Sequence, residues 1–278
     1  MLRLLCAVLV TAGAVVSHPA AAQPKGMSVS VSADVLKDLA PTGKLRAAMN
    51  YGNGVLAQRG PGEQEPKGVS ADLARELARR LGVPVQFAGF DAAGKVFEAL
   101  KAADADPQKW DVAFLAIEPV RAAEIAFTPP YVLIEGTYMV RRDSPLHSVG
   151  DVDRAGIRIA VGPNSAYDLY LTRTLKHAQL VRAEKGGGEA MIRLFLRDNL
   201  EAAAGVRQPL EDYAKTDPGV RVMSDRFMEI RQAMGTPQGR AAGAAYLKTF
   251  IEEMKATGVI AAALAKSGQQ VTVAPAEQ

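Results

Sequence analysis

A regular alternation of strand-like and helical segments between residues 44 and 116 constrains the fold more than any other feature. LRAAMNY, VPVQFAGF and WDVAFLA are short apolar runs typical of buried strands. Between them lie SADLARELARRLG, in which Leu73, Leu77 and Leu81 form an apolar stripe, and DAAGKVFEALKAA. We expect Ser70 to cap the first of these helices and Gly82 to end it. Strands that alternate with helices in this way indicate a parallel sheet covered by helices.

The rest of the chain continues this alternation on a shorter scale and then returns to a helix. After the extended run VLIEGTYMVRR, three further strand–helix pairs follow, and a helix over about 238–257 is expected to close the chain. The order predicts two α/β lobes, the first over 28–131 plus 228–278 and the second, inserted, over 132–227. Two extended crossings, at 131–140 and 227–232, form the expected hinge. A site between hinged lobes can close on a small ligand.

The first residues have the layout of a secretory signal peptide. A short basic start, MLR, precedes an apolar run from Leu4 to Val16, and small residues lead to an expected cleavage after Ala22. The apolar run is too short to span a bilayer. We therefore expect residues 1–22 to be removed and the mature protein to be soluble and periplasmic.

Charge and composition exclude several classes of function. The net charge is +3 and the basic residues are spread along the chain, so nucleic-acid binding has no support. The only cysteine, Cys6, lies in the signal segment, and the three histidines (His18, His147 and His177) are far apart. No metal-ligand spacing and no G-x-S-x-G nucleophile turn are present. We expect no cofactor, no metal and no catalytic residues.

Arg121 stands in an unusual place. It follows the apolar run WDVAFLA and lies two residues after Pro119, which can start a helix. A cation in the first turn of a helix opposes the helix dipole. Either Arg121 and the helix N-terminus together form an anion site, or Arg121 is a surface residue, paired for example with Glu124. The position favours a site, because ligands of parallel sheets bind at the carboxyl ends of strands, here near 50–54 and 116–121.

From about residue 43 to 268, the sequence resembles the family 3 extracellular solute-binding proteins, the type that serves polar amino-acid ABC importers. GKLRAAMNY resembles the first strand of the family, GVSADLARELARRLG its first-lobe helix, WDVAF and RAAEIAFTPPY its Asp-to-Arg segment, and IRIAVGPNSAYDLYL the opening of its second lobe. The resemblance implies an α/β, two-lobed periplasmic-binding-protein type II fold with a discontinuous first lobe and two hinge crossings. It also implies capture of a small carboxylate-bearing ligand, an amino acid or an organic acid, for an ABC permease. We expect a monomer.

The resemblance implies a set of ligand contacts. Arg121 matches the arginine that clamps the ligand carboxylate, because a planar guanidinium binds a carboxylate through two hydrogen bonds. Tyr51 matches an aromatic residue that packs on the ligand, and Ser165 matches a residue that donates to the same carboxylate. Asn50 and Tyr167 are further candidates. Turn formation is the alternative role for Asn50, and helix capping is the alternative role for Ser165.

The sequence departs from the family pattern where the ligand ammonium is usually bound. Val206 stands at the position of the expected aspartate, and Arg207 follows it. The turn before Arg121 looks about two residues short, and Ala116 and Glu118 occupy the place of its usual Thr or Ser. A buried ammonium without a carboxylate is costly. Either Glu118 faces the cleft and supplies the charge, or Glu118 faces solvent and the ligand is an organic anion held by Arg121 and Arg207.

A periplasmic enzyme on the same fold is the alternative function. The cyclohexadienyl dehydratases are similar in architecture and use an acidic group in the cleft as a general acid. The sequence lacks an acid at Val206, which leaves Glu118 as the one obvious candidate. We therefore predict a binding protein rather than an enzyme.

Overall fold

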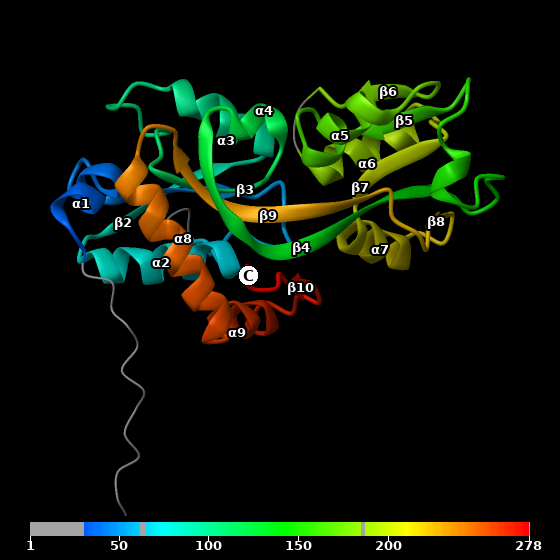
Figure 1. The fold of residues 1–278 in the computed structure, drawn as a ribbon. Coiled ribbons are helices and arrows are strands. Elements are labelled where there is room, and N and C mark those ends of the chain that lie inside the picture. Colours follow the sequence, from blue (N-terminus) through cyan, green and yellow to red (C-terminus); the bar gives the residue numbers. More distant parts are fainter. Residues whose placement is uncertain (1–30, 62–64, 185–186, 278) are drawn as a thin grey trace, which may run out of the picture. The chain divides into compact units, whose positions relative to one another are not determined.

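One mixed β-sheet runs through the molecule in the computed structural model, which describes residues 31–61, 65–184 and 187–277 (Figure 1). The strand order is β2-β1-β3-β9-β4-β7-β5-β6, and β8 and β10 also pair with β4. The expected signal peptide lies outside the described residues. No helix within those ranges is long and apolar enough to cross a membrane.

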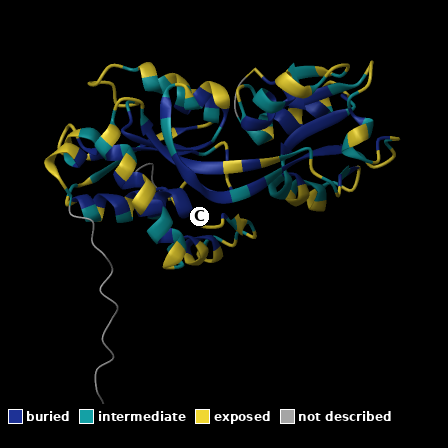
Figure 2. Cartoon of the chain, viewed as in Figure 1, coloured by how far each residue is buried: buried dark blue, intermediate teal, exposed yellow. Residues whose placement is uncertain are grey.

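The first lobe has the predicted βαβαβ order. Strand β1 lies between β2 and β3 and is parallel to both. Every residue of β1 and β3 is buried, because helices cover both faces of this part of the sheet (Figure 2). The elements are α1 (Ala33–Leu39), β1 (Leu45–Asn50), α2 (Val69–Leu81), β2 (Val85–Phe90), α3 (Ala93–Glu98), η1 (Ala99–Lys101), β3 (Val112–Ala116) and α4 (Pro119–Ala122).

The second lobe repeats the parallel arrangement on a smaller scale. Strand β5 is parallel to β6 on one side and to β7 on the other. Helices α5, α6 and α7 pack against these strands (Figure 1). The elements are η2 (Val149–Asp151), β5 (Arg158–Val161), α5 (Ala166–Thr174), β6 (Gln179–Arg182), α6 (Gly188–Arg197), β7 (Ala202–Val206), α7 (Arg207–Thr216) and β8 (Val220–Val222).

Two long antiparallel strands connect the lobes. Strands β4 (Ile125–Arg141) and β9 (Met228–Pro237) pair with each other; β9 also pairs with β3 of the first lobe, and β4 also pairs with β7 of the second. The α/β fold with two lobes, a discontinuous first lobe and two hinge crossings is confirmed. The predicted lobe boundaries fall inside β4, after residue 131, and at the first residue of β9.

Two details of the sequence prediction are wrong. Helix α2 begins at Val69 with Gly68 as its N-cap, and Ser70 is buried with its hydroxyl 3.3 Å from that of Tyr131. Gly68 has a φ of 100°, and a Cβ there would lie 2.6 Å from the Leu56 carbonyl oxygen, so the chain turns into the helix before Ser70. The chain also does not close with one helix. After α8 (Ala241–Ala256), Gly258 adopts a left-handed conformation, and α9 (Val259–Lys266) and β10 (Thr272–Val273) follow.

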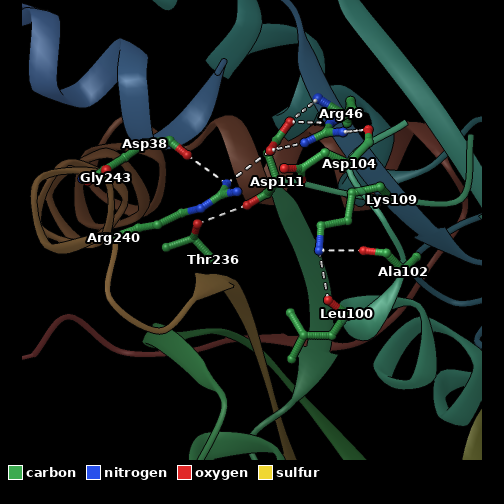
Figure 3. A network of polar contacts seen from close by, with 10 residues as sticks. All are labelled: Asp38, Arg46, Leu100, Ala102, Asp104, Lys109, Asp111, Thr236, Arg240 and Gly243. Atoms are coloured by element: carbon green, nitrogen blue, oxygen red, sulfur yellow. Dashed lines mark hydrogen bonds and ion pairs between the residues drawn. The ribbon is translucent and has the colours of Figure 1, made fainter. Parts of the chain in front are cut away.

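A buried ionic network holds the two parts of the first lobe together (Figure 3). The fully buried carboxylate of Asp111 accepts hydrogen bonds of 2.8 Å from Nε and Nη2 of Arg46 and one of 2.9 Å from Nη1 of Arg240. Arg240 also donates to the backbone oxygen of Asp38 (2.6 Å), and the Thr236 hydroxyl donates to that of Asp111 (2.9 Å). The network joins β1 and the start of β3 to the segment that leads into α8.

Candidate functional site

A cavity of about 80 Å³ lies where two pairs of parallel strands end, β1 with β3 and β5 with β7. Asn50 closes β1, Ala116 closes β3, Gly162 follows β5 and Val206 closes β7, and all four line the cavity. Each pair contributes the carboxyl ends of its strands to the cavity, and ligands of α/β proteins bind at such strand ends. The volume is several times what one water molecule requires, so a small solute fits.

Arg121 lines this cavity and is the most unusual group in it. The residue is only 1% exposed. Its Nη1 donates to the Ala116 carbonyl (3.2 Å) and its Nη2 to the Asn164 carbonyl (2.7 Å), whereas no carboxylate among the described residues lies within 4.0 Å of its nitrogens. A guanidinium has five N–H donors, so most of its capacity remains for a ligand. Burial lowers the pKa of Arg121 to about 10, and the nearby charge of Glu118 opposes that shift.

The immediate surroundings of Arg121 correct one expectation. Helix α4 is a single turn of 4 residues, and Arg121 is in its last turn. The guanidinium reaches the end of β3, where its Nη1 donates to the Ala116 carbonyl. The surface interpretation is wrong, since Arg121 is buried and Glu124 pairs with Lys101 at 3.6 Å.

Four other predicted residues line the same cavity: Asn50, Ala116, Ser165 and Tyr167. The Ser165 hydroxyl caps α5 by accepting from the Asp168 N–H (3.1 Å), and Asn50 Oδ1 accepts from the Gly52 N–H (3.2 Å). Burial raises the pKa of Tyr167. The capping and turn roles considered for Ser165 and Asn50 are therefore present, and both residues also face the space beside Arg121.

Three predicted contacts do not line the cavity: Tyr51, Arg207 and Glu118. The Tyr51 ring has the Arg59 guanidinium 4.3 Å from its centre and lines a separate surface depression. Arg207 pairs with Glu135 of β4 and donates to three backbone oxygens in the segment that follows β8. Because these groups use its donors, Arg207 supports the packing of α7 on the hinge rather than a second contact for an anion.

Glu118 follows neither of the two outcomes considered from the sequence. It does not line the cavity, and it does not face solvent, since it is only 3% exposed. Its carboxylate accepts a 2.7 Å hydrogen bond from Arg173 of α5, which joins the two lobes. Val206, at the place of the missing aspartate, does line the cavity. Among the described lining residues, Arg121 is the only charged one.

Sequence reasoning missed the contribution of β9. Ile230 and Gln232 of this hinge strand both line the cavity, and Gln232 pairs directly with Ala116 in the β3–β9 ladder. The alternation along the strand could have indicated a site residue here. Gln232 is a polar residue at an inward-facing position, between exposed Arg231 and buried Ala233. The sequence prediction treated this stretch only as a hinge.

Three helices begin at the cavity wall. The first residues of α5 and α6 contribute lining atoms, as do Val206 and Pro209 at the start of α7, and neither α6 nor α7 has a side-chain hydrogen bond at its N-cap. Free N–H groups and the positive end of the helix dipole favour a negative charge. The helix ends therefore have the same electrostatic preference as Arg121.

Solved structures with this fold are similar over nearly their whole length. They include a mutant of ArgBP from T. maritima, with 18% identity, a TM-score of 0.69, and coverage of 84% of this chain and 99% of that one. An amino acid ABC transporter substrate-binding protein from Streptococcus pneumoniae, bound to L-arginine, has 17% identity, a TM-score of 0.68 and coverage of 86% and 99%. An ancestral amino acid-binding protein, a precursor of cyclohexadienyl dehydratase, has 19% identity, a TM-score of 0.67 and coverage of 83% and 97%. At these identities the likeness concerns the fold.

The comparison with curated protein sequences found no relative. The sequence pattern of the bacterial extracellular solute-binding proteins, family 3, matches residues 57–270, which is most of the chain. This match agrees with the two-lobed fold and with a cavity at the carboxyl ends of its strands. The chain belongs to the family 3 bacterial extracellular solute-binding proteins.

Proposed function

We propose that this protein is a periplasmic solute-binding protein that captures a small organic anion, through its carboxylate, for an ABC importer. Delivery of a solute to an ABC transporter is what the family implies. The observation that carries the ligand class is the buried guanidinium of Arg121, the only charged side chain among the described lining residues. The signal-peptide layout of residues 1–22 supports the periplasmic location.

An organic acid fits the cavity better than an α-amino acid. A carboxylate at Arg121 neutralises the buried charge and gains charge-assisted hydrogen bonds. An ammonium beside it would need a negative partner, and Val206 and Glu118 do not supply one: the first is apolar, and the second is bound by Arg173 outside the cavity. Burying an unpaired ammonium costs several kcal/mol. This balance also weighs against a dehydratase, because the described lining has no carboxylic acid to act as general acid.

Two contacts across the cleft support a closing motion. Arg121 of the first lobe bonds the Asn164 carbonyl, and Glu118 of the first lobe pairs with Arg173 of the second. We propose lobes over 28–131 plus 228–278 and over 132–227, hinged in β4 and β9. Closure over a bound anion would exclude water and strengthen its pairing with Arg121. A monomer suffices for this cycle.

The test compares two arginine variants in calorimetry and thermal shift against small monocarboxylates such as isovalerate and lactate, with the matching amino acids beside them. Arg121→Gln should weaken the binding of any acid bound by the wild type by about 100-fold or more. The control Arg197→Gln removes an exposed guanidinium whose one ion-pair partner among the described residues is Asp198, and this variant should bind normally. Equal binding by Arg121→Gln, or binding of amino acids alone by the wild type, would contradict the proposal.

A further inference from the structure

The side chain of Gln232 has no hydrogen-bond partner although it is buried. The residue is 5% exposed, and its carboxamide makes no hydrogen bond to any residue in the ranges that the structure describes. The Oε1 and Nε2 atoms of Gln232 are not among the fully enclosed polar atoms that lack a partner, so they stay accessible in the cavity that holds Arg121. A ligand in this cavity can therefore use both the donor and the acceptor of the amide.

The sheet register places this amide beside the anion site. Gln232 pairs with Ala116 across the β3–β9 ladder, so both side chains point to the same face of the sheet, and such neighbours lie about 5 Å apart. The carbonyl of the same Ala116 accepts from Nη1 of Arg121. A ligand whose carboxylate reaches Arg121 therefore brings its adjacent atoms next to Gln232.

A second amide that lines the cavity also lacks a partner for its oxygen. Asn53 is 9% exposed and lines the cavity, and its Oδ1 is buried without a hydrogen bond. A carboxamide offers both a donor and an acceptor whichever way it is turned. Gln232 and Asn53 can thus satisfy a hydroxyl or a carbonyl oxygen, but neither carries the negative charge that an ammonium requires.

One part of the cavity wall is apolar. Met191 and Ile192 of α6, Leu210 of α7 and Ile230 of β9 line the cavity around these polar groups. A ligand that fills the space thus combines one charged group, one uncharged polar group and a hydrocarbon part. Sites that hold their ligand by a few placed polar groups within an apolar lining are typical of small-molecule binding.

We propose that the ligand is an α-hydroxy or α-keto monocarboxylate with a short apolar chain, and that Gln232 determines this specificity by bonding the oxygen next to the carboxylate. The proposal rests on the proposed function, since Arg121 must first hold the carboxylate. It adds a selectivity that Arg121 alone cannot give, because a guanidinium does not distinguish a hydroxy acid from the plain acid.

Two series of acids with matched carbon skeletons test this selectivity. The first is propanoate, lactate, pyruvate and alanine; the second is isovalerate, α-hydroxyisovalerate, α-ketoisovalerate and valine. Calorimetry with the full mature chain should show the hydroxy or keto acid of at least one series bound about tenfold or more tighter than its plain acid and its amino acid.

Gln232→Leu should reduce this preference to about twofold or less while leaving the affinity for the plain acid unchanged. The variant should fold, because the carboxamide that it removes makes no hydrogen bond to the described part of the chain, and its melting temperature verifies this. Gln179→Leu, on an exposed position of β6, is the control and should keep the full preference.

The outcomes separate the two proposals. A preference for the hydroxy or keto acid that survives Gln232→Leu overturns the role of Gln232. Equal, Arg121-dependent binding of plain and hydroxy acids overturns the specificity but leaves the proposed function standing. A wild type that prefers alanine or valine overturns both, and so does a wild type that binds no member of either series at millimolar concentration.

Discussion

Asp111 and Arg121 are two fully buried charges that lie just before and just after the same strand, β3, and they are treated in opposite ways. Asp111 receives hydrogen bonds from two arginines, and its carboxylate has no unused side (Figure 3). Among the described residues, Arg121 donates hydrogen bonds only to two backbone carbonyls and has no carboxylate partner. Both charges are costly to bury, but only one is compensated within the chain.

The difference separates structure from function along one strand. A buried charge that the chain satisfies holds elements together, as Asp111 joins the two parts of the first lobe. A buried charge that the chain leaves short of partners is destabilising unless a ligand completes it, which is the electrostatic signature of a functional site. The four predictions below test this distinction, in order of decreasing expected effect.

Asp111→Ala should be the most damaging single change. It leaves the guanidinium of Arg46 buried without its partner and frees Arg240, so we expect a loss of about 3–5 kcal/mol in the free energy of unfolding. Urea denaturation followed by circular dichroism measures it. A loss below about 1 kcal/mol would mean that the network does not hold the lobe together.

Arg121→Met should have the opposite sign in the unliganded protein. It removes a buried charge with no carboxylate partner and keeps an apolar side chain of similar length, so the free energy of unfolding should stay unchanged or rise by up to about 2 kcal/mol. The same denaturation experiment applies. Destabilisation comparable to that of Asp111→Ala would mean that Arg121, like Asp111, holds the fold together, and that the two buried charges do not differ in role.

Val206→Asp should give the site the compensation that it lacks. A carboxylate at this lining position lies in the same cavity as Arg121, so valine should gain about tenfold in affinity relative to α-hydroxyisovalerate. Competition calorimetry with these two ligands measures the ratio. An unchanged ratio would show that the missing acid does not control the choice between ammonium and hydroxyl.

Glu76 provides the partly exposed reference. Hydrogen bonds from Arg79 and Arg80 lower the pKa of Glu76 to about 2, below its ordinary value of 4.5. Because its pKa is lower in the folded state, ionised Glu76 stabilises the folded protein above about pH 4.5, and this stabilisation is lost as the pH falls towards 2. Because the pair is partly solvated, Glu76→Gln should cost about 1 kcal/mol or less at pH 7, and the gap to the wild type should narrow in acid. If the difference in the free energy of unfolding between the wild type and Glu76→Gln were the same at pH 3 as at pH 7, the ionised Glu76 carboxylate would not be its cause.

Much of the fold could be predicted from the sequence because apolar periodicity and turn residues act locally. The leucine stripe of α2, its end at Gly82 and the buried runs of β1 and β3 are where the pattern placed them. The two wrong predictions also concern local features. Gly68, and not Ser70, is the N-cap of α2, and the left-handed Gly258 separates α8 from α9 where a single helix was expected.

The site was less predictable, because it depends on pairs of residues far apart in the chain. Arg121 was identified in sequence from its position after a buried strand and from the family resemblance. That Glu118 pairs with Arg173, or that Arg207 pairs with Glu135, follows from how α5 and α7 pack against other elements. No local pattern carries this information, so the three candidates outside the cavity (Tyr51, Glu118 and Arg207) could not be separated from those inside it.

The sequence by itself determined the two-lobed α/β plan, the position of Arg121 at the end of β3 and the absence of an acid at Val206, since each follows from residue type and local order. Only the tertiary structure decided which polar groups share the cavity and which are satisfied elsewhere. The physical reason is that hydrogen-bond partners are chosen by proximity in space. Glu118 lies outside the cavity because it pairs with Arg173. Gln232 lies in the cavity wall because it pairs with Ala116 in the β3–β9 ladder.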